Sequence, residues 1–230
     1  MKTSCMAALL AAGLAASAQA QVSYGDSQNE LFDNGFAHLD IVSVSVNHDA
    51  SNIYFDILLR GNVDADTWGK TCIGINTAGG VNSSGNGWGR NVDWAGQGID
   101  YWVGSWADDG GNNFGGELRQ MTDAAGNGNS LLAATYAGPG ISGTASGNTI
   151  SMTLSRALMG LTGNGTFTFD VLTTGGGADP GVDHLSRADQ STPGWGTTSV
   201  AGSFLSYTIP APGAAGLLAL AGLAASRRRR

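Results

Sequence analysis

Charged residues, proline and cysteine are all scarce in this chain of 230 residues. Charged residues make up 13% of it, against a usual share of about 25%. The 37 glycines and 5 prolines together stay below the share of roughly 25–30% that marks low-complexity disorder. Since 42% of the residues are apolar, enough of them remain to fill a core, and we expect a folded domain.

Cysteine is the scarcest of these, because the chain contains Cys5 and Cys72 alone. Cys5 lies in a leader that we expect to be removed, and one remaining thiol cannot form an internal disulfide. The mature domain is therefore predicted to be stable without disulfides. Cys72 lies in the alternating apolar run 71–75, which favours a buried, unreactive side chain over a nucleophile.

Long hydrophobic runs are also missing, since neither apolar end segment reaches the roughly 17–25 residues of an unstrained membrane-spanning helix. The first segment, residues 6–16, follows Lys2 and is followed by an Ala-Gln-Ala tripeptide. This order is the layout of a secretory signal peptide. Residues 1–20 are therefore predicted to be a signal helix that is cleaved between Ala20 and Gln21. The alternative is a buried N-terminal helix.

The second short apolar segment, residues 213–226, lies between a Pro-Ala-Pro tripeptide and four terminal arginines. Because the arginines cannot enter the hydrocarbon of a bilayer, they stop the transfer of the chain across the membrane. They therefore hold this end of the chain at the inner membrane face. A nucleic-acid-binding tail is the alternative, but the adjoining apolar run argues against it. Residues 210–230 are therefore predicted to be a sorting or anchor segment whose hydrophobic helix inserts transiently into the membrane. Its defining residues are Pro210, Pro212, Arg227, Arg228, Arg229 and Arg230.

This order of Pro-x-Pro, short apolar helix and terminal arginines resembles the PEP-CTERM sorting signal of exported Gram-negative bacterial proteins. The resemblance covers residues 210–230 and implies that the export machinery and an exosortase-like enzyme are partners. It also implies tethering to the inner membrane in transit, then transfer to the cell envelope, the outer surface or the medium. Ala211 stands where the family has a central Glu. A variant signal and a permanently membrane-held protein therefore both remain open.

The body of the chain is strongly acidic once these end segments are set aside. Residues 21–209 contain 18 acidic and 6 basic residues, a net charge of −12, whereas the whole chain carries −7. Nucleic acid and anionic lipid surfaces are poor partners for such a field. Cations and neutral sugars are better ones.

Glycine is abundant, and the pattern between the glycines is that of short strands. Long helical bundles are disfavoured, because each glycine inside a helix costs about 1 kcal/mol. Alternating apolar residues and Gly/Asn/Asp turns predict an all-β fold, an antiparallel, jelly-roll-like β-sandwich of about nine strands in one domain, residues 21–209. Residues 155–161 are expected to form a helical turn. The expected strands are 39–46, 53–59, 71–76, 100–105, 116–121, 131–136, 149–154, 166–173 and 203–209, the first two forming a hairpin.

Tryptophans gather in one glycine-rich region of the sequence. Flat aromatic faces stack on the apolar faces of sugar rings, and neighbouring glycines let a polymer approach the backbone. The region therefore predicts a sugar-binding site. The alternative is that these large rings pack in the core, as they do in many sandwiches. The four residues are Trp88, Trp94, Trp102 and Trp106.

No catalytic motif accompanies these residues. The three histidines lack metal-ligand spacing, and no G-x-S-x-G, H-E-x-x-H or P-loop sequence occurs. Paired carboxylates such as those of Asp108 and Asp109 are explained by turn chemistry. We therefore expect no catalytic residues and a protein that is not an enzyme.

Five short stretches of the body carry a second resemblance, which spans most of residues 23–209. They are residues 25–26, 40–41, 49–58, 150–161 and 179–183. Residues 49–58 combine a turn with an N-I-Y-F-x-I strand, and residues 150–161 read as a late strand and turn. They resemble the DOMON-like and family 9 carbohydrate-binding β-sandwich modules. The resemblance implies a non-catalytic sandwich that often holds structural calcium and sometimes binds sugars. It makes Asp26, Asp179 and Asp183 candidate calcium ligands, with plain turn or solvated roles as the alternative.

The function predicted from these observations is non-covalent attachment. We expect an exported protein, tethered to the envelope or released at the surface, that associates with extracellular polysaccharide. The alternative is a structural surface protein or adhesin that contacts other proteins and binds no sugar. Structural calcium is the cofactor to test for.

Overall fold

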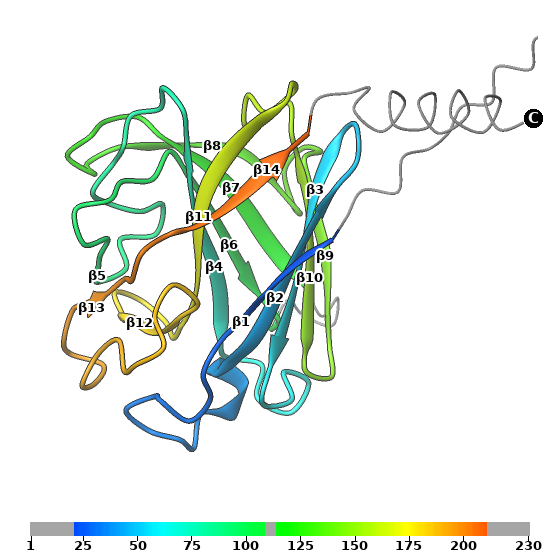
Figure 1. Ribbon diagram of the computed structural model, residues 1–230. Helices are drawn as coiled ribbons and strands as arrows, with labels where there is room; N and C mark the ends of the chain where they lie inside the picture. The colour runs from blue at the N-terminus through cyan, green and yellow to red at the C-terminus, as the bar shows by residue number, and fades with distance from the viewer. Residues whose placement is uncertain (1–20, 109–113, 211–230) are drawn as a thin grey trace, which may run out of the picture.

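The computed structural model describes residues 21–108 and 114–210 (Figure 1). Within these residues the chain forms fourteen β-strands and one short 3-10 helix, η1 (Ala37–Leu39). The predicted signal peptide and residues 211–230 of the predicted sorting segment lie outside the described residues. In the part of the chain that is described, no helix has the length and apolar character needed to cross a membrane.

The five-stranded sheet is antiparallel throughout. It contains the hairpin expected from the sequence, in which Val46 lies opposite Phe55. Asp49 closes the hairpin turn, because its Oδ1 accepts the backbone N–H groups of Ser51 and Asn52, each at 2.7 Å. The strands in spatial order are β1 (Val22–Gly25), β2 (Ile41–His48), β3 (Asn52–Leu59), β10 (Thr149–Ser155) and β9 (Ile141–Ser146).

The seven-stranded sheet is also antiparallel. Its path runs through β12 (Gly181–His184), β11 (Gly165–Thr174), β4 (Lys70–Thr77), β6 (Tyr101–Trp106), β7 (Gly115–Met121) and β8 (Asn129–Ala134). β14 (Leu205–Ile209) pairs with the first half of β11 and β12 with its last residues. β5 (Val92–Asp93) and β13 (Ser199–Val200) form a separate parallel pair.

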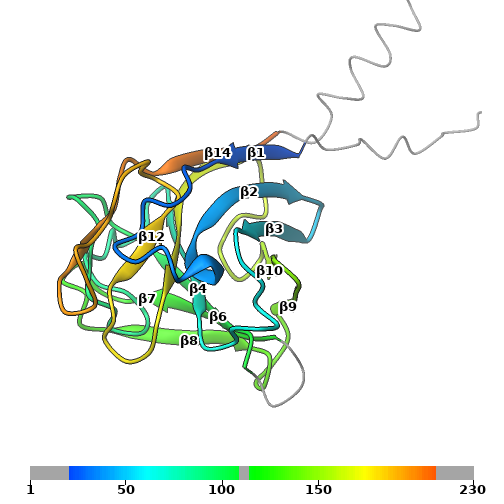
Figure 2. The ribbon, with the colours of Figure 1, turned by 90° about the horizontal axis from the view of Figure 1, so that it is seen from below.

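The main core lies between these two sheets, which face each other in the view from below (Figure 2). Apolar residues alternate along β2, β3 and β10, so that one face of each of these strands is buried. β4 and β6 are buried on both faces. At one edge the sheets are joined by the Tyr24 hydroxyl of β1, which donates to the carbonyl oxygen of Ser206 in β14 at 2.7 Å. The inward-facing residues include Ile53, Phe55 and Ile57 of β3 and Phe167, Phe169 and Val171 of β11.

Loops cover the other face of the seven-stranded sheet and form an outer layer. This layer consists of residues 78–100 and 185–204 and encloses a second apolar cluster. Cys72 is fully buried in this cluster, as the sequence predicted, and burial raises its thiol pKa to about 12. The thiol is therefore protonated and unreactive near neutral pH. The cluster members are Cys72, Val92, Trp94, Ile99, Trp102, Met121, Leu172 and Ala201.

The prediction of an all-β, antiparallel sandwich of two sheets is confirmed, and each of the nine expected strands is present. The expected strand number was too low, because β1, β5, β9, β12 and β13 are short or carry little apolar alternation. The prediction of a helical turn at residues 155–161 is wrong, because no helix forms there. Residues 156–160 form a hydrogen-bonded turn, in which the Met159 N–H donates to the Arg156 carbonyl oxygen at 3.2 Å.

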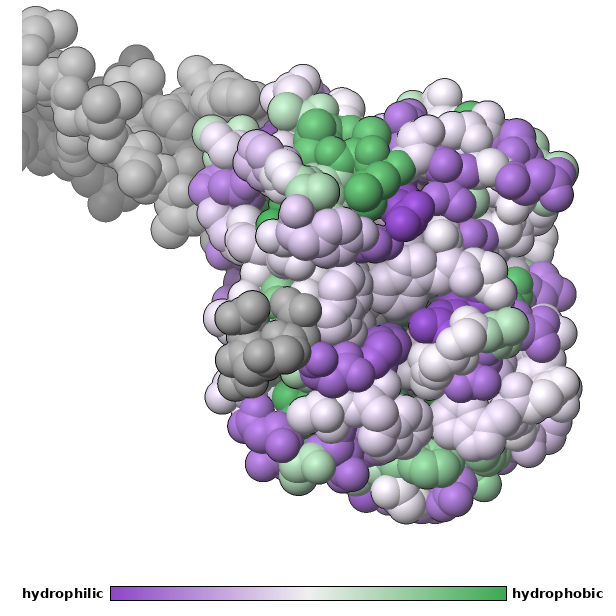
Figure 3. Space-filling model, turned by 180° about the vertical axis from the view of Figure 1, so that it is seen from behind, coloured by the Kyte–Doolittle hydropathy of each residue, from purple (hydrophilic) through white to green (hydrophobic). Residues whose placement is uncertain are grey.

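The surface mixes hydrophilic and neutral residues, and the face seen from behind carries one compact hydrophobic patch near its upper edge (Figure 3). Large apolar side chains that are well exposed form a short set among the described residues. They are Val22, Trp68, Val81, Leu131, Tyr136 and Val200.

Candidate functional site

Two of the four clustered tryptophans lie inside the outer layer. Trp94 is 2% exposed and Trp102 is 0% exposed, and both belong to the second apolar cluster. Trp94 Nε1 donates to the carbonyl oxygen of Gly85 at 3.0 Å, which ties the ring to the covering loop. These two rings present no face to solvent. The predicted sugar-stacking surface is therefore reduced to Trp88 and Trp106.

Trp88 and Trp106 are partly exposed and lie against glycines of the seven-stranded sheet. Trp106 of β6 is opposite Gly115 of β7, and a Cβ atom on Gly115 would be 2.1 Å from its ring. The Trp88 ring lies over Gly104 in the same way, 2.2 Å from an added Cβ. The two ring centroids are 5.9 Å apart at 44°, and the Arg90 guanidinium lies 5.3 Å from the Trp88 ring. Glycine thus lets both rings rest directly on the backbone.

A buried carboxylate fixes the side chains around these rings. Glu117 of β7 is 7% exposed and accepts Trp88 Nε1–H at 2.9 Å and Arg119 Nε–H at 2.7 Å. The Tyr136 hydroxyl, on a residue that is 64% exposed, donates to the other carboxylate oxygen. Burial by itself would raise the pKa of Glu117, but these hydrogen bonds outweigh it and lower the pKa. We call Trp88, Trp106 and Tyr136 the aromatic platform.

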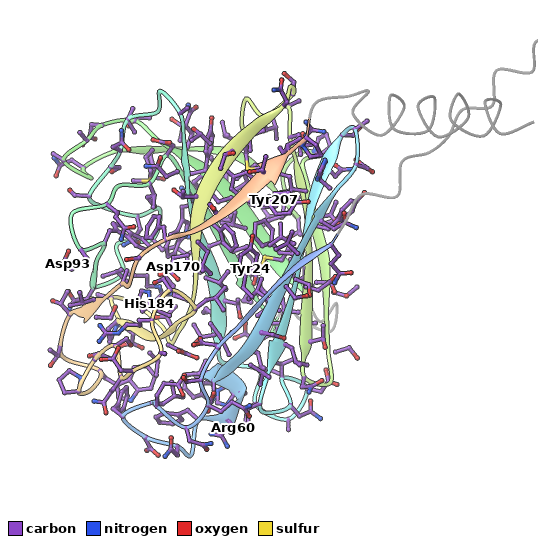
Figure 4. All side chains as sticks on the ribbon, in the orientation of Figure 1. Tyr24, Arg60, Asp93, Asp170, His184 and Tyr207 are labelled. Atoms are coloured by element: carbon purple, nitrogen blue, oxygen red, sulfur yellow. The ribbon has the colours of Figure 1, made fainter. Side chains whose placement is uncertain are left out.

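A groove of about 510 Å³ also opens on the outer layer. Most of its polar groups already bond within the protein. Asn76 Nδ2 donates to the Gly98 carbonyl oxygen at 2.6 Å, and Gln97 Oε1 accepts the Phe204 N–H at 2.8 Å. The groove therefore offers a ligand fewer free donors and acceptors than its composition indicates. Its lining includes Asn76, Asn82, Asp93, Gln97 and Phe204, and Figure 4 labels Asp93.

Asp170, His184 and Ser199 have the connectivity of a catalytic triad. Asp170 Oδ2 lies 2.6 Å from His184 Nδ1, and His184 Nε2 lies 3.1 Å from Ser199 Oγ. All three residues are 0% exposed, and Figure 4 shows Asp170 and His184 side by side within the fold. The Ser199 hydroxyl oxygen also accepts the Gly181 N–H at 2.9 Å. Because a substrate cannot reach this hydroxyl, we assign the three residues a structural role.

The fold brings together two of the three candidate calcium ligands and leaves the third outside the group. Asp26 and Asp183 come together, and Glu30 joins them, with one carboxylate oxygen from each within 4.8 Å of the others. Asp179 is not in this group, and its carbonyl oxygen accepts the N–H of Asn91 at 3.4 Å.

The predicted processing residues are mostly beyond the described ranges. Ala20, Pro212 and Arg227 to Arg230 lie outside them, while Gln21 and Pro210 are exposed at their ends.

Several residues of these sites could not be found from local motifs. Glu117 and Tyr136 are 19 positions apart and meet because β7 pairs with β8. The one available signal is alternation in β7, since Leu118 faces the main core and its neighbour Glu117 must face the outer layer. Glu30 has no such signal, because it lies in an irregular segment.

No protein-family model matches this chain, and no curated protein is similar enough to count as a match. The resemblance of the tail to the PEP-CTERM signal, and of the body to DOMON-like modules, therefore stays a prediction.

Proposed function

We propose that this chain is an exported, non-catalytic β-sandwich protein that attaches to neutral extracellular polysaccharide through the aromatic platform. The observation that carries the proposal is the pair of partly exposed rings, Trp88 and Trp106, beside the exposed Tyr136. One side of each tryptophan rests on glycine backbone. Arg90 covers part of the Trp88 ring, and the part of each ring that stays exposed can stack on a sugar while surrounding polar groups fix its orientation.

The charges around the platform favour a neutral ligand. The Glu117 carboxylate is paired with Arg119 at 2.7 Å, so these two groups have no net charge together. Lys70, opposite Trp106 in the sheet, pairs with Asp108 at 2.9 Å. The body as a whole carries −12, from 18 acidic and 6 basic residues. An anionic polymer would be repelled by this field.

Delivery to the polysaccharide is the second part of the proposal. It relies on the predicted signal peptide, residues 1–20, and on the predicted sorting segment, residues 210–230, with an exosortase-like enzyme as partner. A jelly-roll-like strand order and membership of the DOMON-like modules belong to the same proposal. The burial of Ser199 supports the non-catalytic part, because it removes a triad-like group from reach of a substrate.

Native affinity electrophoresis of the full-length chain in gels that contain soluble β-glucan, mannan or galactan tests the proposal. We expect retention by at least one of these polymers. Trp106→Ala should weaken it by about tenfold or more, as loss of a central aromatic contact does at other interfaces. Trp68→Ala is the matched control. Trp68 is 39% exposed, but it packs against His38 and Trp195 rather than on the platform.

Retention that Trp106→Ala loses and Trp68→Ala keeps would support the platform as the binding surface. A folded wild-type chain that no polymer retains would overturn the proposal. The structural surface protein with protein contacts would then take its place.

A further inference from the structure

A cluster of buried carboxylates lies where the segment after β1 meets β12. Asp26 and Glu30 come from that segment and Asp183 comes from β12, and one oxygen of each lies within 4.8 Å of the others. Asp26 Oδ2 and both carboxylate oxygens of Glu30 are buried without a hydrogen-bond partner among the described residues. Three acidic groups therefore converge with unused ligand atoms.

A fourth carboxylate supplies a second, independent observation. The side chain of Asp40 is 0% exposed, and its Oδ1 has no hydrogen-bond partner among residues 21–108 and 114–210. Its other oxygen accepts Arg60 Nε–H at 2.5 Å and the Asn29 N–H at 3.0 Å. Asn29 adjoins Glu30, so this bond holds Asp40 beside the cluster. Figure 4 labels Arg60, which forms an ion pair with Asp40, and no ion pair with Asp26, Glu30 or Asp183 occurs among the described residues.

Such a cluster is costly without a cation. An ionised carboxylate that is buried must be paired, coordinate a metal or take up a proton. Burial raises the pKa of Asp26 to about 7, and the charges of Glu30, Asp170 and Asp40 add to this rise. Burial and the charge of Asp26 raise the pKa of Asp183 well above its ordinary value. The fold thus holds acidic groups together against their repulsion.

We infer that Asp26, Glu30 and Asp183, with Asp40 beside them, bind one Ca²⁺ ion. Ca²⁺ takes six to eight oxygen ligands at about 2.3–2.6 Å, so two ligands on opposite sides of it are up to roughly 5 Å apart. The 4.8 Å spread of the three carboxylates fits this range. Mg²⁺ fits less well, because it keeps several waters and demands octahedral geometry. The site is independent of sugar binding.

The ion would hold together parts of the chain that are far apart in sequence. Asp183 Oδ2 already accepts the Ile41 N–H at 2.6 Å, which connects β12 to the start of β2. Ligands from Asp26 and Glu30 add the segment between β1 and η1. That segment also carries Phe32 and Phe36, which pack on Trp195 at 5.3 Å each. Ca²⁺ is therefore expected to stabilise this whole end of the sandwich.

Thermal unfolding of the full-length chain, stripped with EDTA and dialysed, is the test. In about a hundredfold excess of Ca²⁺ over its Kd, the wild-type Tm should rise by roughly 5–10 °C. Calorimetric titration with CaCl₂ should show one site per chain, and the same concentration of MgCl₂ should give a smaller rise in Tm. The sequence-predicted but separate Asp179 provides the matched control, and Asp179→Asn should keep the full response.

Glu30→Gln should act in opposite directions in the two conditions. It removes a carboxylate whose oxygens have no hydrogen-bond partner among the described residues, so it should raise the Tm of the metal-free protein while weakening Ca²⁺ binding by about tenfold or more. Asp183→Asn should weaken Ca²⁺ binding similarly, but it should lower the Tm of the metal-free protein, because Asp183 accepts the N–H groups of Ile41 and His184 and an amide can replace only one of these two acceptors. Glu30→Gln is the safer variant, because neither carboxylate oxygen of Glu30 has a hydrogen-bond partner in the described part of the chain. Equal wild-type Tm values with and without Ca²⁺, together with no heat of binding, would overturn the inference. So would an equal or larger effect of Mg²⁺, or loss of the response in Asp179→Asn.

Discussion

Single glycines decide where the large rings of this protein can lie. Gly104 and Gly115 have no Cβ, and the Trp88 and Trp106 rings occupy the space that one would fill. Gly74 does the same for the buried Trp94, whose ring would be 3.0 Å from an added Cβ. The abundance of glycine in the sequence therefore has a packing role in the sheet as well as a role in turns.

Gly104→Ala tests this role at the scale of one methyl group. The added Cβ would lie 2.2 Å from the Trp88 ring, so the ring must move and weaken its bond to Glu117. We expect a loss of about 1–3 kcal/mol in the free energy of unfolding, the usual cost of overpacking. Urea denaturation measures it. Gly165→Ala, in β11 with nothing within 4 Å of the added Cβ, is the control. Equal stability of the two variants would contradict the role assigned to Gly104.

At the scale of elements, one buried arginine joins two turns. Arg156 is 6% exposed and follows β10. It donates to the carbonyl oxygens of Asp49 at 2.5 Å, Leu161 at 2.8 Å and Gly163 at 2.8 Å. It therefore fixes the turn between β2 and β3 against the connection from β10 to β11. No acidic side chain of the described residues pairs with Arg156, so its contribution comes from three hydrogen bonds to backbone.

Arg156→Met keeps the aliphatic stem and removes every donor. Three backbone carbonyl groups lose a charged donor, and we expect the free energy of unfolding to fall by about 2–4 kcal/mol. Arg187→Met should change stability far less, because Arg187 bonds to the exposed Asp189 and to a single carbonyl oxygen, that of the exposed Val200. Chemical denaturation of both variants is the measurement. A loss for Arg187→Met as large as that for Arg156→Met would show that the turns do not depend on Arg156.

The elements that sequence predicts best are those with regular alternation. β2 and β3 bury alternate residues along most of their length, and their positions follow from the pattern of apolar side chains. β11 shows this alternation in its first half and is buried on both faces in its second half. β9, with the sequence ISGTAS, buries Ile141 and Ala145 but carries too few large apolar residues to be recognised. The segment 155–161 has one helix-like feature, a serine at position 155 where a helix cap would stand, but the turn ends at residue 160 and an irregular segment leads to β11.

The candidate sites were less predictable than the fold, because they depend on distant pairings. The sequence placed tryptophans together but could not show that the outer layer buries Trp94 and Trp102. It indicated Asp26 and Asp183 through a family resemblance, yet Glu30 joins them and Asp179 does not. Contacts between residues more than a hundred positions apart, such as that of Ile41 with Asp183, follow from the assembled sheets alone.

At the scale of the whole molecule, the fold separates a stabilising site from a binding surface. The carboxylate cluster involves β12 and the segment after β1, whereas the aromatic platform belongs to β6, the turn after β8 and the covering loop. The acidic body disfavours anionic partners at any surface. We therefore infer that cation binding stabilises the fold and that the aromatic platform binds neutral sugar. Separate experiments can test these two inferences.

The central claim, that the platform binds neutral polysaccharide, is tested most directly by NMR of the tryptophan indole N–H groups. The chain has six tryptophans, so six signals report on all of its indole rings in one spectrum. We expect the Trp88 and Trp106 signals to move when the protein is titrated with neutral hexasaccharides such as cellohexaose and mannohexaose. The buried Trp94 and Trp102, and Trp68 and Trp195 elsewhere, should stay in place. Movement of the Trp68 and Trp195 signals instead, or of none with any hexasaccharide, would contradict the claim.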